Sequence, residues 1–146
     1  MNTVDARDLG IDVTGEHGLY RWLLASFLMG KRIRSTVAVQ AYRILVDQHG
    51  LDTPGKLALC AHSTLVRLLG QAGYARYDES TARRLRVLGR KLDAELGLQL
   101  QALQGGTQDI GPFKHWLLGF EGVGPKTLEI FMREASGQLM HLQQKD

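Results

Sequence analysis

The chain has 146 residues, of which 44% are hydrophobic, and it contains only three prolines and one cysteine. This length and composition predict one folded domain and exclude a disordered or low-complexity chain. The lone Cys60 excludes an internal disulfide, a four-cysteine iron–sulfur cluster and a cysteine-based zinc site, and its apolar neighbours predict a buried core thiol.

Positive charge is concentrated in the middle of the chain. Residues 17–91 hold thirteen Lys and Arg against four acids, a net charge of +9, whereas residues 1–16 and 92–146 each carry a net charge of −3. A concentrated positive field attracts polyanions and speeds their capture, so this pattern favours a nucleic-acid partner. The alternative is an ordinary solvated surface.

The sequence contains no recognisable targeting or membrane segment. Residues 1–16 hold four acids and one Arg, unlike a secretory leader, and no run approaches ~20 apolar residues. We therefore expect an intracellular, cytoplasmic protein with no membrane partner, associated with the nucleoid if the source is a prokaryote.

Residues 1–16 also show no apolar period, which predicts an irregular or weakly ordered arm ahead of a domain over 17–146. Residues 18–30 are apolar nearly all round, which is typical of a helix inside a fold. Residues 34–48 have the pattern of an amphipathic helix, which Gly50 is placed to end.

A third helix is predicted after Thr53, with Pro54 at its first position, ending near Gly70. A long fourth helix is predicted from about Ser80, with a break near Gly97, because a glycine inside a helix costs ~1 kcal/mol relative to alanine. The residues expected to face inward are Leu57, Ala61, Leu65 and Leu68 on the third helix and Leu85, Leu88, Leu92 and Leu96 on the fourth.

The pair Gly105 and Gly106 marks the clearest loop, and helical patterns resume over residues 112–119 and 125–136. No alternating run is long enough for a sheet, and no repeat of solenoid length is present. The sequence therefore predicts an all-α fold, a compact helical domain of about six to seven helices.

The most informative stretch is FEGVGPKTLEIF, residues 120–131. Gly122 and Gly124 permit backbone angles and close approaches that other residues do not. Val123 is placed to pin the turn onto the flanking helices, and Pro125 opens a new helix. A concave turn that leads into a helix N-terminus exposes backbone N–H groups and partial positive charge, which bind a phosphate without reading a base.

Two polar residues follow this turn and extend the predicted site. Lys126 adds a cation and Thr127 a hydroxyl. The alternative is a plain connection between two helices that needed two glycines. The Pro-Lys-Thr sequence and the apolar helix on each side favour phosphate binding.

These segments resemble a known family. Residues 120–128 are similar to the helix–hairpin–helix signature of the endonuclease-III-type base-excision DNA glycosylases. The segment 18–48 resembles the buried helix, basic turn and second helix that open the family's domain, and the segment 68–85 resembles its Gly-Tyr turn and following helix. The resemblance covers about residues 18–136 in the family's order, with the helix–hairpin–helix motif at about 112–136.

The resemblance implies a monomeric enzyme of base-excision repair that bends double-stranded DNA, extrudes a damaged or mispaired base and hydrolyses its N-glycosidic bond. Lys126 falls on the family's lysine position, where the amine attacks the sugar and then nicks the strand as an AP lyase. This chemistry requires a lowered lysine pKa. The alternative is that Lys126 only contacts phosphate.

The family's essential aspartate follows that lysine by a set interval, and the matching window, residues 142–145, holds no carboxylate. Asp146, the last residue, is the nearest and is the candidate catalytic acid, with Glu129 and Glu134 as alternatives. The family's cysteine cluster is missing, so we expect no iron–sulfur cluster and no other cofactor. The histidines show no metal-ligand spacing, so we expect no metal.

Three cations, Lys31, Arg32 and Arg34, follow the first predicted helix. In the family, the matching turn faces the DNA, and a residue near the position of Lys31 fills the gap left by the extruded base. We therefore expect DNA contacts here, with a solvated basic turn as the alternative.

Two further groups remain open between binding and structure. Arg83, Arg86 and Arg90 share one helix face, either as a phosphate track or as solvated charges. Tyr74 and Tyr77 either stack on a base or pack, and packing is favoured for at least one of them.

Three hypotheses of function follow from these patterns. The first is a DNA N-glycosylase with AP-lyase activity through Lys126. The second is a non-catalytic DNA-binding module that keeps the hairpin and lacks the chemistry. The third is a protein-interaction domain that reuses the fold. The sequence does not name the damaged base, because selectivity depends on the shape of the pocket.

Overall fold

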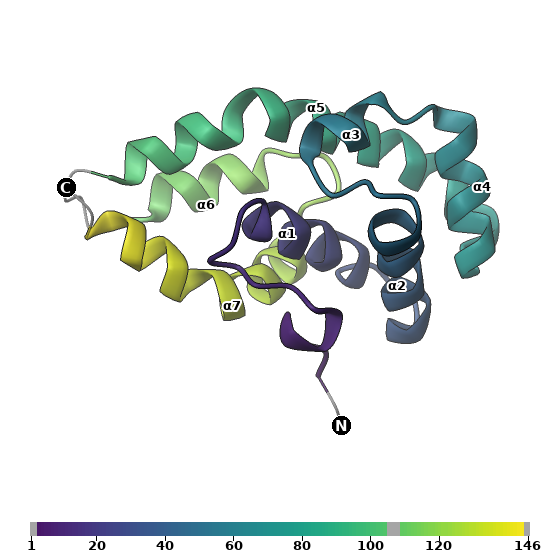
Figure 1. Ribbon diagram of the computed structural model, residues 1–146, viewed down its shortest axis with the longest axis horizontal. Coiled ribbons are helices and arrows are strands. Elements are labelled where there is room, and N and C mark those ends of the chain that lie inside the picture. Colours follow the sequence, from purple (N-terminus) through teal and green to yellow (C-terminus); the bar gives the residue numbers. More distant parts are fainter. Residues whose placement is uncertain (1–2, 105–108, 145–146) are drawn as a thin grey trace.

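A computed structural model describes residues 3–104 and 109–144, and this part of the chain contains helices and no strand (Figure 1). The predicted all-α fold is confirmed. Its α-helices are α1 (Gly18–Met29), α2 (Ser35–Tyr42), α3 (Pro54–Leu59), α4 (His62–Ala72), α5 (Asp78–Leu103), α6 (Gly111–Leu118) and α7 (Pro125–Gln143). Short 3-10 turns occur at Arg7–Leu9 and Ala75–Tyr77, and a π-helical segment, Arg43–Gln48, continues α2. The predicted loop at Gly105 and Gly106 and the candidate acid Asp146 lie outside the described residues.

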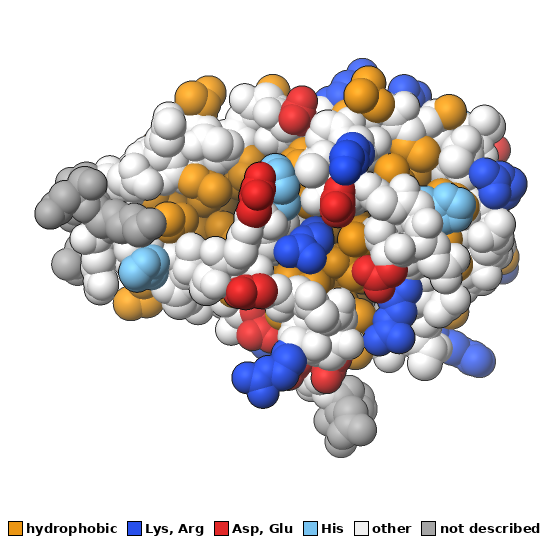
Figure 2. All heavy atoms as spheres, in the orientation of Figure 1, with side chains coloured by type: hydrophobic (Ala, Val, Ile, Leu, Met, Phe, Trp, Pro, Cys, Tyr) orange, Lys and Arg blue, Asp and Glu red, His pale blue; other side chains and the backbone are white. Residues whose placement is uncertain are grey.

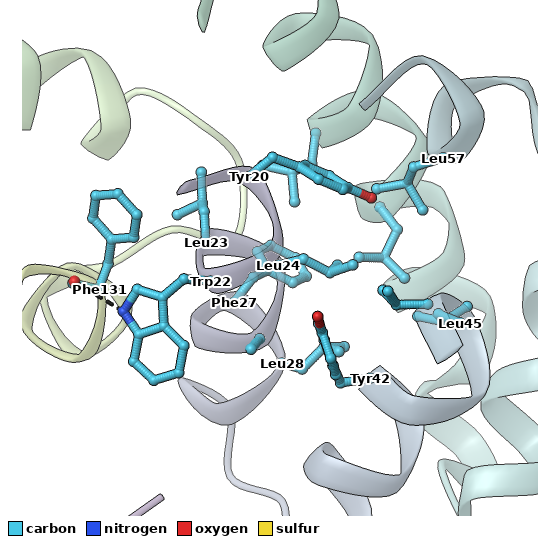
Figure 3. Close-up of a cluster of buried hydrophobic side chains, with 14 of the residues drawn as sticks. Tyr20, Trp22, Leu23, Leu24, Phe27, Leu28, Tyr42, Leu45, Leu57 and Phe131 are labelled. Carbon is cyan, nitrogen blue, oxygen red and sulfur yellow. Dashed lines mark hydrogen bonds between the residues drawn. The ribbon is translucent and has the colours of Figure 1, made fainter. Parts of the chain in front are cut away.

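Helix α1 lies at the centre of the fold, as its apolar surface predicts, and packs against α2 and α7 (Figures 1 and 3). Trp22, Phe27 and Leu28 are fully buried. The indole Nε1 of Trp22 donates to the Phe131 carbonyl of α7 at 3.0 Å, so the large ring is buried without an unpaired donor (Figure 3). This contact fixes the start of α7 against the middle of α1.

The predicted third helix is two helices. Thr53 caps α3 by accepting from the Lys56 N–H at 3.2 Å, as expected for this start. The chain is extended at Cys60 and Ala61, with ψ of 131° and 144°, and this break separates α3 from α4. The predictions that Cys60 and Ala61 are buried are therefore wrong, because the break turns Ala61 to the surface and leaves Cys60 half-buried. The inward leucines at positions 57, 65 and 68 are buried as predicted.

Helix α5 runs without the predicted break at Gly97. Leu92 and Leu103 are buried, and Leu96 and Leu100 pack against the core, so apolar contacts hold the helix on both sides of the glycine. These contacts outweigh a local cost of ~1 kcal/mol.

The N-terminal segment is irregular but is not a loose arm. Ala6, Leu9 and Ile11 are buried in the same core as the helices. The Ala6 N–H donates to the carboxylate of Glu134 on α7 at 2.8 Å. Over the described residues 3–16, the expectation of a weakly ordered arm is therefore corrected, because the apolar residues of this segment, though unperiodic, reach the core.

Candidate nucleic-acid interface

Residues 119–124 join α6 to α7 and form what we call the glycine turn. Gly122 has a φ of +89°, in the left-handed region that strains side chains, and a Cβ on it would lie 2.8 Å from the Phe27 ring of α1. Val123 is 5% exposed, and its N–H donates to the Phe120 carbonyl at 3.1 Å. The conformational role predicted for Gly122 and the packing role predicted for Val123 are both confirmed.

Neither the backbone conformation nor steric crowding requires a glycine at position 124. Its φ of −110° is open to any residue, and no atom lies within 4 Å of a Cβ placed on it. It precedes Pro125, the first residue of α7, and no side chain caps this helix. The first amides of α7 are therefore left for water or a ligand, and the helix dipole adds partial positive charge at the same place.

A hollow of about 350 Å³ opens at this helix start, and we call it the turn hollow. The glycine turn and the first residues of α7 line it together with Gly30 and Lys31 at the end of α1. Lys126 is exposed, whereas Thr127 is 1% exposed, and a Cβ on Gly30 would collide with the Thr127 hydroxyl. That hydroxyl therefore packs closely against the end of α1, and Thr127 is also among the residues that line the turn hollow.

Lys31 is bound to the glycine turn. Its ammonium donates a hydrogen bond to the Gly122 carbonyl and lies 4.5 Å from the centre of the Phe27 ring. Burial, followed by the positive charge of Arg84, lowers the pKa of Lys31. Lys31 therefore braces the turn, which no local sequence pattern indicated.

The other two cations of the predicted basic turn lie outside the lining of the turn hollow. Arg32 and Arg34 are both exposed. Arg34 immediately precedes α2, and its side chain makes no cap for that helix. Neither side chain lines the turn hollow, so of the three predicted cations the structure brings only Lys31 to it.

A second tie joins the glycine turn to α5. Arg83 donates two hydrogen bonds to the two carboxylate oxygens of Glu121, each at 3.0 Å, and Arg84 donates a third at 3.3 Å. The hydrogen bonds from Arg83, then from Arg84, lower the pKa of Glu121. Arg83 is thus engaged by the glycine turn, whereas Arg86 is half-buried and Arg90 is exposed.

The two tyrosines have opposite environments. Tyr74 is 2% exposed, and burial raises its pKa. Its hydroxyl has no hydrogen-bond partner among the described residues. Tyr77 is 56% exposed. The prediction that at least one of them packs is confirmed by Tyr74, and Tyr77 remains open for binding.

The candidate acids are only partly placed by the structure. Asp146 lies outside the described residues, so its distance from the Lys126 amine is not defined. Glu134 accepts the Ala6 N–H and holds the N-terminal segment, whereas Glu129 is exposed on α7. The described part of the chain has no cluster of three residues able to hold a metal ion.

Another groove, also of about 350 Å³, lies among α1, α5 and α7 and shares no residue with the turn hollow. Leu92, Leu96 and Leu100 form much of it, with Asp93 and His17 among the polar residues. Figure 2 shows hydrophobic side chains gathered in a depression on this side of the molecule. It has no Lys or Arg in its lining, so it does not suit a phosphate.

The structure thus gathers the glycine turn, the uncapped start of α7, Lys126 and Lys31 at one hollow. None of the described helices is long and apolar enough to cross a bilayer. No protein-family model, no curated protein and no solved structure matches this chain.

Proposed function

We propose that this protein binds the phosphate backbone of double-stranded DNA at the turn hollow and acts in base-excision repair. The observation that carries the proposal is an uncapped helix start inside a hollow, next to an unobstructed Gly124 and an exposed Lys126. Backbone N–H groups, the helix dipole and a cation are the three components that bind a phosphate oxygen without reading bases.

The rigidity of the glycine turn supports this binding role. Lys31 holds the Gly122 carbonyl, and Glu121 is held by Arg83 and Arg84. A turn that is already fixed loses little conformational freedom when a ligand binds, so more of the interaction energy appears as affinity.

The proposed reaction is excision of a damaged or mispaired base. The resemblance of residues 120–128 to the helix–hairpin–helix signature supports this reaction, with Lys126 as the amine and Asp146 as the acid. The neutral Lys126 amine would attack C1′ of the sugar and displace the base, which leaves with a proton; opening of the C1′–O4′ bond would then give an imine, and elimination of the 3′ phosphate from it would cut the strand. In a strictly hydrolytic variant of the reaction, Lys126 would only hold the phosphate.

A non-catalytic DNA-binding module is the second candidate, and one set of contacts favours it. Glu134, one of the two alternative acids, is engaged by the Ala6 N–H, so it is not free to serve as the acid. Lys126 is exposed to solvent, whereas activated lysines lie in desolvated sites. This candidate keeps every feature of the turn hollow and omits the chemistry.

One assay separates the two candidates. The protein is incubated with duplexes carrying uracil, oxidised guanine, alkylated purine, deoxyinosine or an abasic site, with borohydride present to trap an imine. An adduct that disappears in Lys126→Ala and persists in Lys56→Ala, a distant exposed lysine, supports the lyase. Base release without an adduct supports a hydrolytic glycosylase. Duplex binding without base release on any substrate supports the module.

The proposal as a whole depends on DNA binding that weakens as salt rises, because each neutralised phosphate releases counterions. A protein that binds no duplex even at low salt would contradict both candidates and favour a protein-interaction domain.

A further inference from the structure

A second hollow, of about 230 Å³, lies beside the turn hollow and shares Lys31 with it. We call it the tyrosine hollow. One side is formed by the residues that follow α1, and the other by the first two turns of α5 and the residue before it. Its lining residues are Lys31, Arg32, Ile33, Tyr77, Ser80, Thr81 and Arg84.

The lining of the tyrosine hollow combines an aromatic face with cations. Tyr77 leaves 56% of its surface exposed, which is unusual for a large ring that could pack. Ala75, two residues earlier, has a φ of +41°, a strained conformation for a residue with a side chain. The chain thus adopts an unfavourable backbone conformation two residues before an exposed aromatic residue, and such strained residues cluster at functional sites.

The polar atoms of the tyrosine hollow suit an anion attached to a flat group. Arg32 is exposed, and Arg84 uses its Nε for Glu121. The start of α5 is not itself an anion site, because its first residues are acidic and the Asp78 carboxylate accepts the Glu79 N–H at 2.7 Å. The attraction for an anion therefore comes from the arginines, and the flat surface comes from the Tyr77 ring.

We propose that the tyrosine hollow binds one unpaired nucleotide of the DNA, with its base stacked on Tyr77 and its phosphate beside Arg32 and Arg84. A volume below the roughly 300–1,000 Å³ of drug-sized ligand pockets limits the occupant to a single base. Because Lys31 lines both hollows, a strand whose phosphate occupies the turn hollow has a neighbouring nucleotide within reach of the tyrosine hollow. This site rests on the proposed DNA binding and adds a preference for duplexes that contain an unpaired base.

The test compares two duplexes that differ by a single bulged nucleotide, with 2-aminopurine as the bulged base. We expect the wild-type protein to bind the bulged duplex more tightly than the paired one and to quench 2-aminopurine fluorescence by stacking. Tyr77→Ala should lose roughly 5- to 150-fold of affinity for the bulged duplex, the range for one base stacked on an aromatic ring, and should lose the quenching. Tyr77→Phe, which keeps the ring, should retain both.

Two controls separate this site from the turn hollow. Arg90→Ala, an exposed arginine on the same helix outside the tyrosine hollow, should leave the preference for the bulged duplex unchanged. Gly124→Val should weaken binding to both duplexes alike, because it acts on the shared phosphate contact. Tyr77 is exposed, so its variants should unfold at the same temperature as the wild type.

The outcomes distinguish the two proposals. If Tyr77→Ala affects neither duplex, or weakens both equally, the nucleotide site is wrong while the turn hollow stands. If Gly124→Val leaves both affinities intact while Tyr77→Ala abolishes the preference, the turn hollow is wrong and the nucleotide site stands. A wild-type protein that binds neither duplex at low salt contradicts both.

Discussion

The residues that follow α1 and the glycine turn meet at the turn hollow, and each brings one lysine to it. Lys31, which follows α1, is half-buried, and its ammonium donates a hydrogen bond to the Gly122 carbonyl. Lys126 follows the second and is exposed. The sequence presents both as cations beside a predicted phosphate site, yet one is committed to the fold and the other is free for a ligand. Burial and a nearby carbonyl decide this difference, and neither is visible in the local sequence.

The largest difference in stability is expected between substitutions at the two glycines of the turn, Gly122 and Gly124. Gly122→Val forces a β-branched residue into a φ of +89° and against Phe27, so we expect a loss of about 2–5 kcal/mol in the free energy of unfolding. Gly124→Val places the same side chain in extended backbone with open space, so we expect a loss of less than about 1 kcal/mol. Urea unfolding measures both, and equal losses would show that the two positions are not distinct.

The next largest difference in stability is expected between variants of Lys31 and Lys126. Lys31→Met keeps the stem over Phe27 but removes the charged donor to Gly122, so we expect about 1.5–3 kcal/mol less stability. Lys126→Met should change stability by no more than about 0.5 kcal/mol, because the side chain is exposed. A Lys31→Met protein as stable as the wild type would mean that this lysine does not brace the turn.

For DNA affinity we expect the opposite order, with Lys126 more important than Lys31. If the Lys126 ammonium neutralises one phosphate, Lys126→Met reduces the steepness of the plot of log affinity against log salt by about 0.9. Lys56→Met, with an exposed lysine on α3, should leave the slope unchanged. Binding isotherms from low to moderate salt give both slopes, and an unchanged slope for Lys126→Met would remove this lysine from the interface.

The smallest effect is expected from Glu121, which ties the turn to α5. Its pKa is lowered by Arg83 and Arg84, so its contribution to stability is present above its ordinary pKa of 4.5 and is lost as the pH falls through the lowered value. Thermal unfolding between pH 7 and pH 3 should show this loss in the wild type and not in Glu121→Gln. If the wild type and Glu121→Gln lost stability in parallel as the pH fell, the contacts of Glu121 with Arg83 and Arg84 would not contribute to stability.

The elements that local patterns define were predictable. An apolar surface all round predicts the buried α1, and two glycines followed by Pro125 predict a turn that opens α7. The glycines themselves look equivalent in sequence, and only the folded backbone, with its left-handed φ at Gly122, and the position of Phe27 distinguish Gly122 from Gly124.

The contacts that hold the site together could not be predicted, because they join distant residues. Lys31 and Gly122 are 91 positions apart, and Ala6 and Glu134 are 128 apart. No periodicity connects such pairs, since each forms only after the helices have packed. The same packing corrects the local signal at Gly97, where leucines on both sides keep α5 unbroken.

The central claim is that the uncapped amides at the start of α7 bind a DNA phosphate, and Gly124→Val tests it most directly. A side chain at this position projects into open space beside those amides without disturbing the fold. We expect this variant to unfold at nearly the wild-type temperature and to bind a paired duplex about tenfold or more weakly, since one charge-assisted hydrogen bond contributes about 1.5–3 kcal/mol. A folded Gly124→Val protein with wild-type affinity for the duplex would contradict it.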